Sequence, residues 1–245
     1  MSSSMKRPLK LGLKPYCPWL DSLTFVGSSV SEKMLLEACV ENLFEAQVAE
    51  KRGAHRLELC SHLDLEGLSP GKELAQAVVQ AVNIPVKVMI RHRGGNFHYT
   101  PAEIDALEKE ILDARSWGVQ GIVIGLLDEQ GEVDIAPTSR LALAAGPLSV
   151  TFHKAIDETA DLLQSLQRLQ AIPGIDAILT SGGAPTAEQG NATLIQMIQQ
   201  APPHLQIIPA GRITALNVNS IHQALGASEY HGRRIVGDLG VMGNG

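Results

Sequence analysis

Eight short apolar runs, each rich in strand-forming residues, alternate with helical patterns along this chain of 245 residues. The first run begins at residue 34 and the last at residue 228, so successive runs start about 28 residues apart, close to what a strand, a helix and two short loops need. Buried strands that alternate with helices predict a parallel sheet, and eight of them predict a closed (β/α)8 TIM barrel. An open doubly wound sheet would have a G-x-G-x-x-G turn after its first strand, and this chain has none there.

The segments between the runs have helix signals. Thr100, Pro101 and Glu103 together form an N-cap, a first helical residue and a capping box. Residues 42–53 place their apolar side chains on one stripe, and residues 186–201 also have a helical pattern. After the eighth run only RRIVGDLGVMGNG remains, which is too short and too glycine-rich for a full helix, so we expect an incomplete or missing last helix.

The two ends of the chain differ from the repeating part. The first ~20 residues are basic and lack the apolar centre of a signal peptide. We expect residues 1–33 to form an irregular N-terminal extension. A flexible tail and a transit peptide are alternative interpretations of this segment. Residues 34–245 are expected to form a single TIM-barrel domain.

Composition excludes several classes of function. A net charge of −6 with 4% aromatic residues gives no electrostatic footprint for nucleic acid. No run approaches the ~18 to 20 apolar residues of a membrane span. Three cysteines, Cys17, Cys39 and Cys60, do not make a disulfide framework, so we expect a reducing, cytoplasmic setting.

Charged residues within the runs predict which side chains face the lumen. The working face of a barrel lies at the C-terminal ends of its strands, where side chains alternate between the lumen and the helix layer. An unpaired charge between sheet and helices is too costly, so Glu37 and Glu58 should face the lumen, with Cys39 and Cys60 on the same side. Because neighbouring strands lie about 4.8 Å apart, these four residues are expected to cluster.

Two further features suggest an anion site. By the same parity Arg91 and Arg93 face the mouth, where their forked guanidinium groups suit a phosphate or carboxylate. The alternative is that they simply neutralise the two lumenal glutamates. Ser181 and Gly182 end the sixth run, and their backbone N–H groups suit an anion nest.

Histidines at the mouth are candidates for acid–base chemistry. His153 and His231 end the fifth and eighth runs, with Asp157 and Glu229 as candidate orienting partners. Thr151 shares the side of His153. A single histidine at a strand end is more often a hydrogen-bonded structural residue, whereas two facing one mouth favour a functional role.

The motifs of the runs occur in a specific order: LLEACV, GAHRLELC, GLSP, VMIRHRGGNFHY, GIVIGLL, TFHKAID and ILTSGG. This pattern resembles the copper homeostasis protein CutC family over residues from about 34 to 231. The resemblance implies a (β/α)8 barrel, a homo-oligomer (dimer or tetramer) and a link to copper tolerance, with no established reaction. It also implies that Cys39 and Cys60 are ligands of Cu(I), a soft ion that thiolates suit.

The chain departs from the family pattern at several positions. His92 stands for a proline and Asn96 for an aspartate in the third motif, and Arg212 stands for a glycine after the seventh run. These changes concern the loops at the mouth.

Two functions remain open. In the first, the protein is a cytoplasmic copper-binding protein that holds Cu(I) on Cys39 and Cys60, unless these cysteines only pack as small apolar side chains. In the second, it is an enzyme acting on a small phosphate or carboxylate, which the arginine pair anchors while Glu58 and His153 exchange protons. A scaffold or oligomeric interaction protein is a third possibility.

Overall fold

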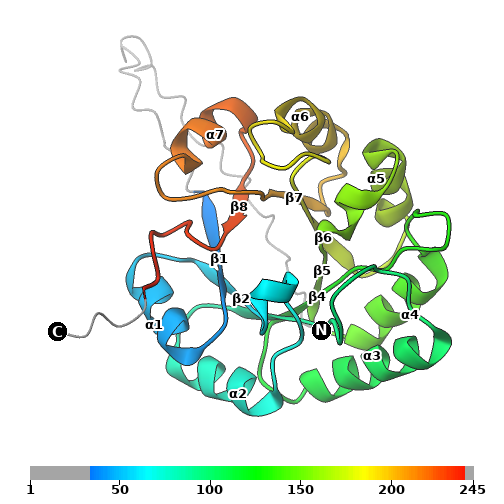
Figure 1. Cartoon of the computed structure of the whole chain (residues 1–245), viewed down its shortest axis with the longest axis horizontal. Coiled ribbons are helices and arrows are strands. Elements are labelled where there is room, and N and C mark those ends of the chain that lie inside the picture. Colours follow the sequence, from blue (N-terminus) through cyan, green and yellow to red (C-terminus); the bar gives the residue numbers. More distant parts are fainter. Residues whose placement is uncertain (1–33, 241–245) are drawn as a thin grey trace, which may run out of the picture. The chain divides into compact units, whose positions relative to one another are not determined.

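The structure is a computed structural model that describes residues 34–240. Its strands form one parallel sheet rolled into a barrel, with helices around the outside (Figure 1). The strands are β1 (Leu35–Val40), β2 (Arg56–Leu59), β3 (Val86–Met89), β4 (Gly121–Ile124), β5 (Ser149–Phe152), β6 (Ile175–Thr180), β7 (Gln206–Pro209) and β8 (Glu229–Gly232). All eight predicted runs contain a strand, and the (β/α)8 fold class is confirmed.

Helices follow the first seven strands. They are α1 (Leu43–Lys51), α2 (Lys72–Ala81), α3 (Pro101–Ala114), α4 (Ile135–Ala145), α5 (Leu162–Gln170), α6 (Asn191–Gln200) and α7 (Val218–Leu225), with short 3₁₀ helices η1 (Leu63–Leu65) and η2 (Lys154–Glu158). Residues 233–240, after β8, contain no helix. No helix among residues 34–240 is long and apolar enough to cross a membrane.

The predicted boundaries of the domain stay predictions at both ends. The extension of residues 1–33 and the last residues, 241–245, lie outside the described part of the chain. Because residues 233–240 contain no helix, the expectation of an incomplete or missing last helix agrees with the structure as far as residue 240.

Local sequence signals explain where helices begin. Thr100 Oγ1 accepts a hydrogen bond from the Glu103 N–H at 3.3 Å, and Glu103 Oε2 accepts one from the Thr100 N–H at 2.7 Å. This is the predicted capping box. Helix α6 begins at Asn191, five residues later than residues 186–201 suggested. The chain before it packs closely, since a Cβ on Gly190 would lie 1.9 Å from the Ser181 carbonyl oxygen.

The hydrogen-bonded order of the strands is β7-β6-β5-β4-β3-β2-β1-β8. Strands β7 and β8 lie side by side (Figure 1), yet the described residues form no ladder between them. This seam is bridged beyond the strands, where the Ala215 N–H donates to the Arg234 carbonyl at 2.9 Å. Ser228 Oγ also donates to Gln206 Oε1 across it at 3.0 Å.

The two sides of the lumen differ in polarity. Strands β6 and β7 contribute an apolar cluster of Ala177, Leu179, Ile208 and Ala210. Strands β8, β1, β2 and β3, which are contiguous in the sheet, contribute the charged side chains described below. The charged side chains on the strands themselves therefore lie on one half of the barrel.

Candidate functional site

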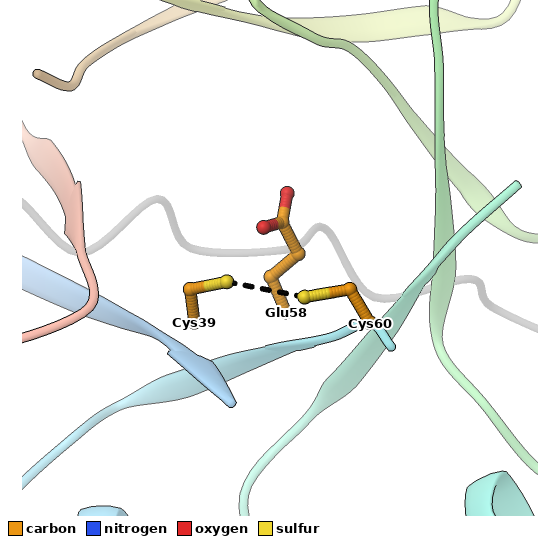
Figure 2. A group of neighbouring side chains, drawn as sticks. All are labelled: Cys39, Glu58 and Cys60. Carbon is orange, nitrogen blue, oxygen red and sulfur yellow. Dashed lines mark hydrogen bonds between the residues drawn. The ribbon is translucent and has the colours of Figure 1, made fainter. Parts of the chain in front are cut away.

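The structure brings the two predicted cysteines together. Cys39 lies on β1 and Cys60 directly follows β2, and their Sγ atoms are 3.3 Å apart (Figure 2). Both side chains are buried. Glu58, on β2 opposite Cys39, lies between them, and the three candidate ligand atoms are all within 4.8 Å of one another. The arrangement is a compact set of two soft ligands and one carboxylate.

Two members of this set have a raised pKa. The hydrogen bond with Cys60, burial and the Glu58 charge raise the pKa of the Cys39 thiol well above its ordinary value. Burial and the nearby Glu37 charge raise the pKa of Glu58. A soft metal bound here must therefore displace a proton from Cys39.

A buried charge network lies beside the thiols. Glu37 accepts hydrogen bonds from His231 Nδ1 at 2.8 Å and from Arg56 Nε. Arg56 Nη2 also donates to Glu229 at 2.6 Å, and His231 Nε2 lies 3.7 Å from Glu58 Oε2. Glu37 and Glu229 thus contact residues of the site without lining the cavity, and Glu229, expected as an orienting partner of a histidine, binds Arg56 instead.

The pKa shifts within this network follow from its contacts. Burial opposes the ionisation of Glu37, but the His231 hydrogen bond and the Arg56 charge outweigh it and hold the pKa of Glu37 far below its ordinary value. Burial also opposes protonation of His231, but the Glu58 charge and hydrogen bonds to Cys39 and Glu37 raise its pKa well above the ordinary value. His231 is therefore an imidazolium between two carboxylates, not a free base.

Two lumenal cations were missed by the sequence analysis. Arg56 on β2 binds Glu37, and Lys87 on β3 donates from Nζ to Thr151 Oγ1 at 2.7 Å. Burial lowers the pKa of Lys87. The parity argument applied to Glu58 places Arg56 on the same face of β2, so the signal was present. The Thr151 side chain is therefore a hydrogen-bond partner of buried Lys87 and does not line the cavity at the mouth.

The two predicted mouth arginines separate. Arg91 lines the cavity, but Arg93 binds Glu103 at the start of α3 through Nε at 2.5 Å and stacks over Tyr99. The expectation that Arg93 shares the mouth is therefore wrong. The alternative that the two arginines neutralise the lumenal glutamates is also wrong for Glu37, whose ion-pair partners are on β2 and β8.

The predicted anion nest after β6 is filled by the protein itself. The Asp157 carboxylate accepts from the backbone N–H groups of Ser181, at 2.9 Å, and Gly183, at 2.9 Å. It also accepts from Thr180 Oγ1 at 2.5 Å. The Gly182 N–H donates to Thr180 Oγ1 at 2.9 Å. Ser181 and Gly183 therefore hold an internal carboxylate where we expected a ligand at Ser181 and Gly182, and Asp157 is directed to this backbone and not to His153 as an orienting partner.

His153 is a buried, neutral imidazole. Its Nδ1 accepts a hydrogen bond from the Ala155 N–H at 3.1 Å, so the ring proton is on Nε2. Burial, followed by the charge of Arg91, lowers the pKa of His153 to about 3. The ring occupies space left by Gly125 after β4, where a Cβ would lie 2.2 Å from Cε1. The absence of a side chain at Gly125 therefore leaves room for the His153 ring.

The low pKa of His153 predicts a pH dependence of stability. Because the folded protein keeps the ring neutral while the unfolded chain protonates it near pH 6.5, His153 contributes stability that is lost as the pH falls from 6.5 toward 3. The loss is up to about 1.4 kcal/mol per pH unit. His153→Asn keeps an acceptor for the Ala155 N–H, so denaturant titrations should show a shallower acid slope for this variant. Equal slopes would contradict the assignment.

A cavity of about 400 Å³ opens above the thiols. Of the predicted residues, it is lined by Cys39, Glu58, Cys60, Arg91, His153, Asp157 and His231. Apolar walls come from Leu63, Met89, Phe97 and Leu179. Phe97 was not predicted, although it lies in the same polar stretch as Arg91. Most of the predicted functional side chains therefore converge on one cavity.

A second group of candidate ligand atoms, from Glu37, Glu58 and His231, is also compact. It suits a cation poorly, because Arg56 already binds Glu37 and His231 is protonated. Among the described residues the thiol set is the better candidate for a metal.

Fold and site together define a class of protein, a (β/α)8 barrel with a buried thiol pair and an acid–imidazolium network at the C-terminal ends of its strands. The sequence profile of the CutC family matches residues 34–236, and the chain belongs to that family.

Individual relatives support the assignment. The chain is 39% identical over 197 residues to the human copper homeostasis protein cutC homolog, covering 80% of this chain and 72% of the human protein. It is 36% identical over 198 residues to the family protein CutC of Xanthomonas campestris pv. campestris strain B100, covering 81% and 82% of the two chains. The crystal structure of a CutC protein from Streptococcus agalactiae aligns with a TM-score of 0.78 at 31% identity, covering 82% of this chain and 99% of that one.

Barrels outside the family align less closely. Phosphonopyruvate hydrolase gives a TM-score of 0.62 at 16% identity over 84% of this chain and 77% of its own. At that identity the likeness concerns the fold alone.

Proposed function

We propose that the protein acts in copper homeostasis by binding Cu(I) through Cys39 and Cys60. The observation on which this rests is the buried pair of Sγ atoms 3.3 Å apart at the base of the cavity. Thiolates are soft ligands that select Cu(I) over magnesium or calcium. The names of the human and Streptococcus agalactiae relatives agree with a role in copper homeostasis.

The thiol pair needs a small adjustment to hold a metal. With metal–thiolate bonds of about 2.3 Å, a linear site requires sulfurs about 4.6 Å apart, which is more than the present separation. One side chain must rotate, and the cavity above the pair leaves room for this. Glu58 is close enough to take part as a third ligand or to accept a thiol proton. The His231 imidazolium next to Glu58 offsets the negative charge that deprotonated thiols add.

The test is to replace both thiols. In competition with a chromophoric Cu(I) chelator under reducing conditions, the wild-type protein is expected to retain about one equivalent of copper. The double variant Cys39→Ser, Cys60→Ser is expected to bind at least about 100-fold more weakly, since even removal of a ligand's supporting partner costs 10- to 100-fold. Cys17→Ser, outside the described residues, is the matched control and should leave retention unchanged. Undiminished retention by the double variant would refute the proposal.

A cytoplasmic setting and a homo-oligomer, dimer or tetramer, belong to the same proposal. The buried thiols support a reducing compartment, because they must stay unoxidised to bind Cu(I). Size-exclusion chromatography with light scattering tests the oligomer.

The second hypothesis, an enzyme acting on a small phosphate or carboxylate, has less support from the geometry. Arg93 lies outside the cavity, and in the expected nest the Ser181 N–H binds Asp157 while the Gly182 N–H donates to Thr180. Of its expected parts, Arg91, Glu58 and His153 remain at the cavity. We assign no reaction to them.

A further inference from the structure

A methionine lies beside the thiol pair in the lumen. Cys39, Cys60, Met89 and Val123 form a buried cluster distinct from the main core, and Leu63 packs against it. Three of these four buried side chains carry sulfur, and all three of those residues line the cavity. Among the methionines of residues 34–240, Met89 is the one on that lining. Two thiols and a thioether therefore share one apolar region of the lumen.

The strand register places Met89 next to Cys60. Leu59 on β2 pairs with Val88 on β3, and the next residues along the two strands are Cys60 and Met89. Met89 ends β3, and its side chain has the lumenal parity of Lys87, two residues earlier. Neighbouring strands lie about 4.8 Å apart, and a methionine side chain is unbranched and flexible. The Met89 thioether can therefore reach a metal held by the thiols.

The charge of the site favours this thioether over the Glu58 carboxylate as a third ligand. Cu(I) on two thiolates has one net negative charge, and a carboxylate would add a second among side chains that are all buried. A thioether adds no charge, and it is a soft donor of the kind that selects Cu(I). Glu58 also has a partner of its own, because its Oε2 lies 3.7 Å from His231 Nε2. Met89 is therefore the better third ligand.

From these observations we infer that Met89 is the third ligand of the proposed copper site and determines its preference for Cu(I). The inference rests on the proposed function, because it needs copper on Cys39 and Cys60. Zinc sites in proteins use thiolate, imidazole and carboxylate ligands. Removal of the thioether should therefore weaken the binding of Cu(I) and leave the binding of Zn²⁺ unchanged.

The experiment is X-ray absorption spectroscopy at the copper edge, on the full chain produced with selenomethionine and loaded with Cu(I). Selenium scatters more strongly than sulfur, so a bound Met89 is expected to appear as a copper–selenium contact beside the copper–sulfur contacts. Met89→Leu should lose the selenium contact and keep the sulfur contacts. Met197→Leu is the matched control, because Met197 is fully buried but lies on α6, off the cavity lining, and it should keep both kinds of contact.

A second measurement gives the size of the effect. In competition with the chromophoric Cu(I) chelator, Met89→Leu is expected to bind copper at least about 10-fold more weakly than the wild type, because removal of even a ligand's supporting partner costs about 10- to 100-fold. Its affinity for Zn²⁺ should be unchanged. Leucine and methionine have similar volumes, so the variant should fold, and circular dichroism establishes this before binding is scored. Glu58→Gln should keep the selenium contact, because the carboxylate is not the third ligand.

The outcomes separate this inference from the proposed function. If the wild type retains Cu(I) and the double variant Cys39→Ser, Cys60→Ser does not, the proposed function stands. The role of Met89 is then overturned by the absence of a selenium contact, by unchanged copper binding in Met89→Leu, or by an equal loss of zinc affinity, which packing would explain. If the wild type retains no Cu(I), both the proposed function and the role of Met89 are refuted. A selenium contact that only Met89→Leu loses, together with weaker copper binding alone, supports the inference.

Discussion

Replacing Glu37 with glutamine is expected to lower the free energy of unfolding by about 3 to 5 kcal/mol, the range for breaking a buried ion pair from one side. Glu37 is 1% exposed and is the shared partner of Arg56 and the His231 imidazolium. A glutamine is uncharged, and its amide nitrogen, itself a donor, would face one of the two groups that donate to Glu37, Arg56 Nε or His231 Nδ1. Both cations would then remain buried with too little negative charge beside them.

The measurement is urea denaturation at neutral pH. Glu229→Gln is the matched control, because Glu229 binds the same Arg56 but its side chain is 18% exposed. This control is expected to cost no more than about 1 kcal/mol, as for partly exposed ion pairs. If the free energy of unfolding falls equally in the two variants, burial of the Glu37 ion pairs does not explain how the network stabilises the fold.

Replacing Gly125 with alanine is expected to lower the free energy of unfolding by about 2 to 3 kcal/mol, the usual cost of overpacking. The added Cβ would lie 2.2 Å from Cε1 and 2.3 Å from Nδ1 of His153, well inside contact distance. The imidazole would have to leave its position and give up the hydrogen bond from Ala155. The loss of stability therefore arises from a clash with one side chain, so removing that side chain should restore part of the stability.

The rescue variant is Gly125→Ala in a His153→Ala background. Without the ring the added methyl group has space, so the cost of Gly125→Ala should fall by at least about 1 kcal/mol, a coupling typical of residues in contact. Gly94→Ala is the control, because a Cβ there meets only ordinary contacts, the nearest at 3.5 Å from Leu65. Denaturation of the four members of the cycle gives the coupling energy, and a value near zero would contradict the steric explanation.

The eight strands and the clustering of the thiols with Glu58 could be predicted because both depend on local periodicity. A strand alternates its side chains, so one buried glutamate determines the face of its neighbours two residues away. Arg56 and Lys87 obey the same rule and were missed only because each lies early in its strand, before the expected mouth.

The errors occur where that periodicity ends. β3 stops at Met89, so alternation no longer determines the direction of Arg93, four residues further on. Asp157 lies in η2, whose turn directs the carboxylate to the backbone after β6. Nothing in the sequence spacing specifies that turn, and so the nest seemed free for a ligand.

Arg212 shows how a departure from the family pattern is tolerated. Its φ is 57°, in the left-handed region that favours glycine. The backbone thus keeps a conformation suited to the glycine that the resemblance led us to expect, and a non-glycine residue there is held at some conformational cost.

The missing ladder between β7 and β8 has a mechanical consequence. In a fully laddered barrel, every strand is restrained from both sides, and widening the lumen breaks hydrogen bonds wherever it occurs. Here the wall can part at one place while β8, β1, β2 and β3 stay joined. Cys39, Cys60, Glu58 and His231 all lie on or directly after those joined strands. The barrel can therefore widen between β7 and β8 without changing the register of the strands that carry its thiols and charges.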